Sequence, residues 1–165
     1  MYTFYKILTR LTPLFLKAFG YFKPRIREFQ KHRRDWDKNL RKELKKATKP
    51  LIWIHCSSLG EYEQAKPVIQ SLNKEAEFLI ALSFFSDSGF KNVKHDGTFD
   101  AVFYLPFDTE ANMNKVLDIL NPQAIVLVKY ELWPSLIEQS LRRRKRIYLI
   151  SALFKDSSWL FKYYG

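Results

Sequence analysis

The stretch LIWIHCSSLGEYEQAKPVIQSL, residues 51–72, decides the fold of this chain. It opens with six mainly apolar residues, passes through a short polar segment with one glycine, and continues with a helical pattern. Apolar runs separated by helical segments are typical of a parallel sheet that is covered on both faces. The sequence therefore predicts an α/β, Rossmann-like fold with helices on both faces of the sheet. The further apolar runs lie at residues 77–83, 101–105, 124–128 and 146–151, and the predicted helices at 62–73, 109–120 and 134–143.

The charge of the chain is concentrated near its N-terminus. The 165 residues include 28 Lys and Arg against 17 Asp and Glu, a formal net charge of +11. Residues 1–50 hold 15 basic and 4 acidic residues, whereas residues 51–165 hold 13 of each. We therefore predict two parts, a basic segment over residues 1–49 and a single domain over residues 50–165 that is long enough to bury a core.

The basic segment has the pattern of an amphipathic helix. Lys6, Arg10 and Lys17 recur at helical spacing within residues 4–23, whose other positions are mainly apolar. Residues 25–47 predict a second helix with a thin apolar seam and many Lys and Arg side chains. Such a segment is typical of attachment to an anionic membrane surface. It could instead pack on its own domain, or bind nucleic acid. Because the chain has no recognised nucleic-acid-binding motif, we expect no nucleic-acid partner.

The cysteine content and the N-terminal pattern exclude disulfides, cysteine-based metal sites, a signal peptide and a membrane-spanning helix. The single cysteine, Cys56, excludes an internal disulfide and a metal site built from several cysteines. The basic residues near the N-terminus interrupt its apolar residues, and no small-residue cleavage site follows. The sequence therefore predicts neither a cleaved signal peptide nor a membrane-spanning helix, which needs about 20 mainly apolar residues.

The loop after the first predicted strand is a candidate site, because ligands bind beyond the carboxyl ends of strands in open α/β sheets. It contains Ser58, Gly60 and Glu61. The loop lacks the three glycines of a dinucleotide-binding motif and the Gly-x-Ser-x-Gly of a nucleophile elbow. Its glycine allows close approach of a ligand. Glu61 lies at a helix N-terminus, where the helix dipole favours the ionised form of its carboxyl group. It could accept a proton from a ligand hydroxyl, or it could simply cap the helix.

Other polar residues in the predicted loops and strands have ordinary structural interpretations. Ser58, Ser86 and Ser88 are typical helix caps and turn formers. His55 lies within an apolar strand, which favours a core histidine with satisfied hydrogen bonds over a catalyst. Glu131 is different, because a carboxylate at the end of a buried strand is costly unless it has a partner.

Three motifs together resemble the 3-deoxy-D-manno-octulosonic acid (Kdo) transferase family of lipopolysaccharide biosynthesis. Residues 53–72, WIHCSSLGEYEQAKPVIQSL, are similar to its Trp-x-His-x-x-Ser-x-Gly-Glu segment. YLPFDT at 104–109 is similar to its Leu-Pro-x-Asp segment, and YELWPSLI at 130–137 to its Glu-x-Trp-Pro-Asn segment, with Ser135 in place of the usual Asn. The order and spacing of the motifs agree, and the resemblance covers residues 51–165.

The resemblance implies an inverting glycosyltransferase of the GT-B type, in which two Rossmann-like halves face a cleft and no metal or cofactor is needed. The donor would be CMP-Kdo and the acceptor the lipid A precursor. Glu61 corresponds to the catalytic base of the family, and Glu131 to a second catalytic carboxylate in the cleft. The substrate-binding residues that the resemblance implies are Ser58, Gly60, Ser88 and Gly89.

The resemblance also implies a location and an extent for this chain. It would lie peripherally on the cytoplasmic face of the inner membrane, with Lys6, Arg10 and Lys17 in contact with lipid. Members of the family are more than twice as long, and their donor-binding half follows the segment that ends at Gly165. We therefore expect the acceptor-binding half, without the donor-binding domain and inactive alone. The alternative is a noncatalytic Rossmann-like module that docks on a membrane or a protein, with Glu61 as a helix cap.

Overall fold

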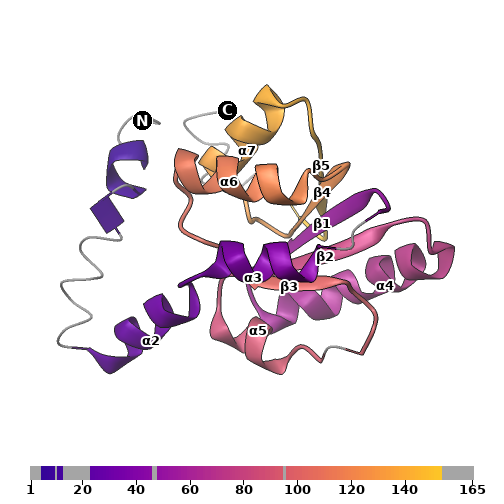
Figure 1. Cartoon of the computed structure of the whole chain (residues 1–165), viewed down its shortest axis with the longest axis horizontal. Coiled ribbons are helices and arrows are strands. Elements are labelled where there is room, and N and C mark those ends of the chain that lie inside the picture. The colour runs from indigo at the N-terminus through magenta and orange to yellow at the C-terminus, as the bar shows by residue number, and fades with distance from the viewer. Residues whose placement is uncertain (1–4, 10, 13–22, 46–47, 95, 154–165) are drawn as a thin grey trace.

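The structure, a computed structural model, describes residues 5–9, 11–12, 23–45, 48–94 and 96–153 of the chain. Within this part, five parallel strands form one sheet in the order β3-β2-β1-β4-β5 (Figure 1). This confirms the predicted α/β fold, and the second strand lies slightly later than predicted. The strands are β1 (Leu51–Cys56), β2 (Leu79–Phe84), β3 (Ala101–Tyr104), β4 (Ala124–Val128) and β5 (Arg146–Ile150).

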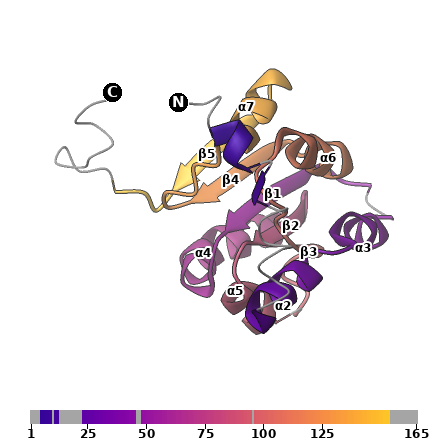
Figure 2. The same cartoon turned by 90° about the vertical axis from the view of Figure 1, so that its left-hand side faces the viewer.

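Helices cover both faces of the sheet (Figures 1 and 2). Three of them share one core with alternate β1 residues such as Trp53, and the other two pack on the opposite face with Ile54 and Cys56. All six residues of β1 are buried, as the central strand of a doubly covered sheet requires. The first group is α3 (Trp36–Glu43), α6 (Glu110–Leu120) and α7 (Pro134–Arg142), and the second is α4 (Leu59–Glu75) and α5 (Asp87–Asn92).

The strand order reverses between β1 and β4. From β1 the chain builds outward through β2 to β3, then crosses over by α6 to place β4 on the other side of β1. In sheets of this kind the ligand crevice lies beyond the carboxyl ends of the strands at the point of reversal. The fold therefore predicts a ligand site at the residues that follow β1 and β4.

The prediction of one helix over residues 25–47 is wrong, because the chain forms α2 (Pro24–His32) and α3 with a break between them. Asp35, at the break, has a φ of 57°, which a continuous right-handed helix cannot accommodate. Leu40 of α3 is fully buried in the core beside the sheet. Residues 24–43 thus pack against the domain, and a membrane role for this stretch stays a prediction.

Arg33, in the break between α2 and α3, ties these helices to the carboxyl edge of the sheet. Its guanidinium lies 3.5 Å from the ring centroid of Phe29 and donates to the carbonyl oxygen of Leu105 over 3.2 Å. Only 8% of the residue is exposed. Burial lowers the pKa of Arg33 to about 10, although the nearby Asp87 and Tyr104 act in the opposite direction. Arg33 therefore holds the break between α2 and α3 against the loop after β3, a role that its place among other basic residues did not indicate.

Residues 5–9 and 11–12 are helical and lie beside the domain (Figure 2). The Tyr5 hydroxyl donates to Asp108 Oδ2 over 2.8 Å, and Lys6 Nζ lies 3.1 Å from Glu138 Oε2. Arg10 and Lys17, predicted with Lys6 as lipid contacts, lie outside the described residues. None of the described helices is both long and apolar enough to cross a membrane. The large apolar side chains that this helical stretch exposes are Ile7, Leu8 and Leu11.

The close packing of α5 on the sheet gives a stability prediction for Gly89. A Cβ at this position would lie 2.0 Å from the ring of Phe84, so Gly89→Ala should lower the free energy of unfolding by about 1–3 kcal/mol. Gly60→Ala is the matched control, because its Cβ would meet only Ser58 Oγ, at 3.9 Å, and it should be neutral or slightly stabilising. Urea denaturation measures both, and equal effects would contradict this packing.

Candidate active site

Glu61 and Glu131 lie at the same edge of the sheet, beyond the two strands where the strand order reverses. Glu61 is in the first turn of α4, which follows β1, and Glu131 is in the loop after β4. Both act on Cys56, the last residue of β1: burial raises the pKa of its thiol, and the charges of the two carboxylates raise it further. The two residues that the sequence predicted as catalytic thus follow neighbouring strands at one edge of the sheet, and their catalytic roles stay predictions.

Glu61 forms a capping box with Ser58, the residue at the N-cap of α4. Its Oε2 accepts hydrogen bonds from the backbone N–H of Ser58 over 2.6 Å and from the Ser58 hydroxyl over 2.8 Å. Oε1 accepts no hydrogen bond from the described residues. The capping role that the sequence left open is therefore present in this structure. It occupies one oxygen of a half-buried carboxylate, and the role of Glu61 as base stays a prediction.

Glu131 has the partners that its buried position requires. The Nε1–H of Trp133 donates to its Oε2 over 2.9 Å, and Nε2 of His55 lies 3.7 Å from the same oxygen. Burial opposes ionisation of this carboxyl, but interactions with His55 and hydrogen bonds from Trp133 and Ser57 outweigh it, so the pKa of Glu131 lies below its ordinary value. Lys129, which begins the loop, has a φ of 61° and turns the chain sharply after β4. Glu131 is therefore held as an anion at the carboxyl edge.

His55 is buried, as the apolar strand predicted, but only one of its two ring nitrogens is hydrogen-bonded. Nδ1 lies 2.8 Å from Ser83 Oγ and 3.2 Å from the Ser83 carbonyl oxygen. Nε2 has no hydrogen bond within the described part of the chain. The edge of the ring faces Trp133, with the centroids 5.8 Å apart. The unpaired nitrogen faces Glu131, which the interpretation as a fully satisfied core histidine did not foresee.

Asp108 joins the loop after β3 to the start of α7. It is 2% exposed, and its two carboxylate oxygens accept the backbone N–H groups of Ser135, over 2.8 Å, and Leu136, over 2.9 Å. The hydroxyl of Ser135 also donates to the Asp108 carbonyl oxygen over 2.9 Å. Burial raises the pKa of Asp108, although these hydrogen bonds oppose the rise. The Leu-Pro-x-Asp and Glu-x-Trp-Pro motifs are thus one structural unit, a role that neither motif shows alone.

Ser88 and Gly89 lie in α5, after β2, and have different surroundings. Ser88 is exposed, and its hydroxyl lies 2.8 Å from that of Ser86. The backbone N–H of Ser86 donates to the carbonyl oxygen of Ser57 over 2.8 Å, which joins this loop to the one that carries Ser58. Gly89 is buried against Phe84. Ser88 therefore borders the edge of the sheet, whereas Gly89 packs a helix, and substrate contact stays a prediction for both.

Comparison with known proteins decides the family. Residues 30–163 match the family described as 3-deoxy-D-manno-octulosonic-acid transferase (kdotransferase). The chain belongs to this Kdo transferase family. The matched range contains Glu61, Asp108 and Glu131, and it begins within α2, so it includes α3 as well as the sheet.

Several relatives share the same region. A bifunctional glycosyltransferase/methyltransferase of Fusobacterium nucleatum is 33% identical over 111 residues, which is 66% of this chain and 17% of that protein. The 3-deoxy-D-manno-octulosonic acid transferase of Aquifex aeolicus is 32% identical over 97 residues, 58% of this chain and 27% of the relative. The 3-deoxy-D-manno-octulosonic acid transferase of Haemophilus influenzae is 34% identical over 96 residues, which is 56% of this chain and 22% of the relative. The chain thus spans well under two thirds of the length of these relatives.

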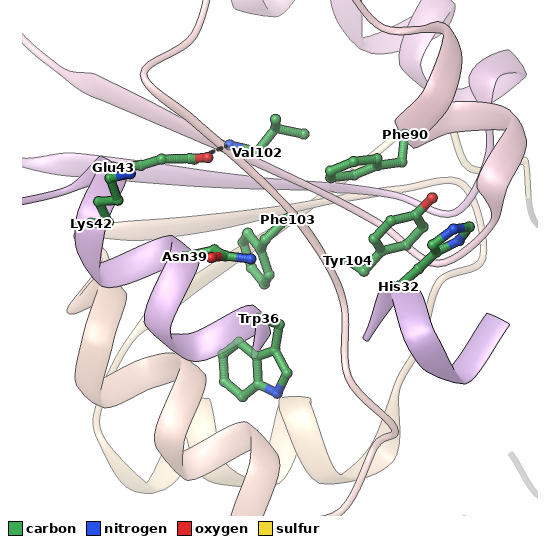
Figure 3. A pocket seen from close by; sticks show the side chains of 9 residues that line it. All are labelled: His32, Trp36, Asn39, Lys42, Glu43, Phe90, Val102, Phe103 and Tyr104. Carbon is green, nitrogen blue, oxygen red and sulfur yellow. Dashed lines mark hydrogen bonds between the residues drawn. The ribbon is translucent and has the colours of Figure 1, made fainter. Parts of the chain in front are cut away.

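A pocket of about 390 Å³ lies at the outer edge of the sheet, away from the two carboxylates. Figure 3 shows its side chains, which come from α2, α3, α5 and β3. In it, Glu43 Oε2 accepts the backbone N–H of Val102 over 2.9 Å, a donor on the free side of edge strand β3. Pairing this donor within the chain protects the edge from other strands. Neither Glu61 nor Glu131 lines this pocket.

One group of metal-ligand side chains occurs within the described residues. Possible ligand atoms of Glu28, His32 and Asp87 all lie within 4.8 Å of one another. The ammonium of Lys91 already lies 2.9 Å from Asp87 Oδ2 and 3.3 Å from Glu28 Oε1 and supplies a cation there. The group lies on α2 and α5, apart from the two site carboxylates. The expectation that the reaction needs no metal or cofactor stays a prediction.

The buried cap of α7 gives a second stability prediction. Asp108→Asn should lower the free energy of unfolding by about 1–3 kcal/mol, because the amide NH₂ would face a backbone N–H that now donates to a carboxylate oxygen. Asp118→Asn is the matched control, since the Asp118 side chain is 61% exposed and its loss should cost less than about 0.5 kcal/mol. Equal losses in urea denaturation would show that Asp108 is not the main cap.

Proposed function

We propose that this chain is the acceptor-binding half of an inverting glycosyltransferase that moves Kdo from CMP-Kdo to the lipid A precursor in lipopolysaccharide biosynthesis. The family membership supports Kdo transfer. The observation that carries the proposal is the position of Glu61 and Glu131, which follow the two strands between which the strand order reverses. In GT-B enzymes this edge of the acceptor half would face the cleft.

Glu61 serves as the general base in this proposal. An acceptor hydroxyl attacks the anomeric carbon of Kdo, the bond from that carbon to the CMP phosphate oxygen breaks on the opposite face, and the hydroxyl proton passes to Glu61. Ser58 holds Oε2 through two hydrogen bonds, which leaves Oε1 to receive the proton. A base in this role must come within about 2.6–3.2 Å of the hydroxyl oxygen, and it commonly contributes about 10²–10⁴ in rate.

The other predicted site residues have parts consistent with their surroundings. Glu131 is held as an anion by Trp133 and His55 and would orient a hydroxyl of the bound acceptor or donor. Gly60 is exposed in the first turn of α4, next to Glu61, and would allow close approach of the substrate. Ser88 is exposed beside the neighbouring loop, and its hydroxyl would form a hydrogen bond with the substrate.

The donor half is a separate part of the proposal. The chain covers 17% to 27% of the relatives named above, so we propose that a second Rossmann-like half binds CMP-Kdo. The reaction then needs no metal or cofactor, because an ionised base and a phosphate leaving group suffice. This chain alone should bind acceptor without turning over.

We also propose that the protein lies on the cytoplasmic face of the inner membrane as a peripheral protein. The helical stretch near the N-terminus exposes Ile7, Leu8 and Leu11, and the surplus of basic residues up to residue 50 would attract anionic lipid. Lys6 is engaged with Glu138 in this structure, so a lipid contact through Lys6 would require exchange of that ion pair for a lipid phosphate.

Replacement of the base by its amide tests the mechanism. Glu61→Gln should abolish most Kdo transfer in an enzyme that also contains the donor half, because Gln cannot take a proton. The fold should persist, since Gln also completes a capping box. The measurement is transfer from CMP-Kdo to a lipid A precursor, with Glu63→Gln as control, because Glu63 is exposed on the same helix and pairs with Lys66. Near-normal turnover of Glu61→Gln would remove Glu61 from the role of base.

Membrane attachment has its own test. The triple variant Ile7→Ser, Leu8→Ser, Leu11→Ser should co-sediment less with vesicles of phosphatidylglycerol and phosphatidylcholine, because the apolar area that enters the lipid is lost. Leu141→Ser is the matched control, since Leu141 is 61% exposed on α7. Unchanged sedimentation of the triple variant would argue against attachment through this helix.

A further inference from the structure

We propose that His55 is a positioning residue for Glu131, and that Ser83 sets the tautomer in which His55 acts. The proposal rests on the proposed function, because it assigns a task to two residues of the same site. It also accounts for the Trp-x-His spacing at the start of the family motif, which the catalytic roles of Glu61 and Glu131 leave unexplained.

The spacing places both side chains on one serine. Trp53 and His55 are two residues apart on β1, so they project from the same face of the sheet. Ser83 of β2 is the register partner of His55. Its Oγ lies 2.8 Å from Trp53 Nε1 and 2.8 Å from His55 Nδ1, and all three residues are 0% exposed. The hydroxyl therefore links two β1 side chains in a site shut off from solvent.

This arrangement favours one tautomer of His55. The indole N–H of Trp53 can only donate, so it takes an acceptor position on Ser83 Oγ and leaves the serine proton to be donated elsewhere. Donation of that proton to Nδ1 of His55 puts the imidazole proton on Nε2. In the opposite tautomer Nδ1 would donate to Ser83, whose carbonyl oxygen also lies 3.2 Å away, but the buried serine proton would then lose its acceptor on the imidazole.

The proton on Nε2 then faces Glu131. Nε2 lies 3.7 Å from Glu131 Oε2 and has no other hydrogen-bond partner among the described residues. Trp133 Nε1 already donates to the same oxygen over 2.9 Å. A small rotation of the carboxylate would give Oε2 two N–H donors. This would fix the carboxylate as an acceptor and leave its other lone pairs for a ligand hydroxyl.

The surroundings of Glu131 explain why such support is needed. The carboxylate is partly buried, and Glu61 lies close enough for both charges to act on Cys56. Burial favours a protonated Glu131, which would lose the negative charge that strengthens the hydrogen bonds from its N–H donors. Burial acts to raise the pKa of Glu131, whereas hydrogen bonds from His55 and Trp133 act to lower it.

The tautomer can be read directly in the 165-residue chain. Two-dimensional ¹H–¹⁵N spectra of the imidazole nitrogens distinguish the Nε2–H from the Nδ1–H form, and the chain has three histidines, so His32→Asn and His95→Asn assign the signals. We expect His55 in the Nε2–H form, and a loss of that preference in Ser83→Ala. An Nδ1–H form in the unchanged chain would overturn the proposal, whatever the activity of the enzyme.

Two substitutions at His55 separate positioning from packing. His55→Gln can place an N–H donor near the position of Nε2, whereas His55→Asn keeps a polar group near Nδ1 and loses the donor toward Glu131. In the enzyme with its donor half, we expect Asn to lower kcat with little change in KM, and Gln to retain a higher kcat than Asn. Urea denaturation checks that both variants fold.

The outcomes distinguish this proposal from the proposed function. Equal kcat for the folded Gln and Asn variants would overturn the positioning role and leave Kdo transfer standing. Normal transfer by Glu61→Gln would instead overturn the base mechanism, whatever the tautomer of His55. If His55→Asn does not fold, the imidazole spectra of the unchanged chain still decide the proposal.

Discussion

The carboxylate of Asp108 accepts hydrogen bonds from two consecutive backbone N–H groups of α7 although it is almost completely buried. This contact fixes the start of α7, and with it one end of the loop that carries Glu131. The other end is fixed by β4, where Lys129 turns the chain through a left-handed conformation. Because the loop is held at both ends, Glu131 can stay at the carboxyl edge as an anion beside Trp133 and His55.

In the mechanism that we propose, Glu61 serves both the fold and the chemistry. Its Oε2 holds the first turn of α4 through Ser58, and this bond fixes the direction of the carboxylate. A base that is already oriented loses little freedom when the acceptor binds, which is the advantage of a rigid site. Capping uses Oε2, so the proposed proton transfer to Oε1 would not compete with it. The amide substitution separates them because it retains the cap.

The sequence predicts the sheet well, and it predicts which loops share one edge of the sheet, because both depend on local patterns. Apolar runs identify the strands, and parallel strands end at one edge, so loops that are distant in sequence become neighbours. The Ser58 and Glu61 pair is also local, with a spacing that either a cap or a base would explain. The resemblance supplies the roles of these residues, which spacing alone leaves open.

Contacts between distant residues were not predictable in this way. Asp108 meets Ser135, and His55 meets Ser83, across separations that depend on the register of strands and the docking of α7. The break at Asp35 was missed because charged residues on either side continue a helical pattern. Gly89 resembled a ligand-binding glycine, yet its small size first serves the contact with Phe84.

A structure of the enzyme with its donor half and a bound lipid A precursor would test the central claim most directly. The account predicts an acceptor hydroxyl within about 2.6–3.2 Å of Glu61 Oε1, with Ser58 still bonded to Oε2. An acceptor sugar bound away from the carboxyl ends of β1 and β4, with Glu61 in contact only with its own helix, would contradict it.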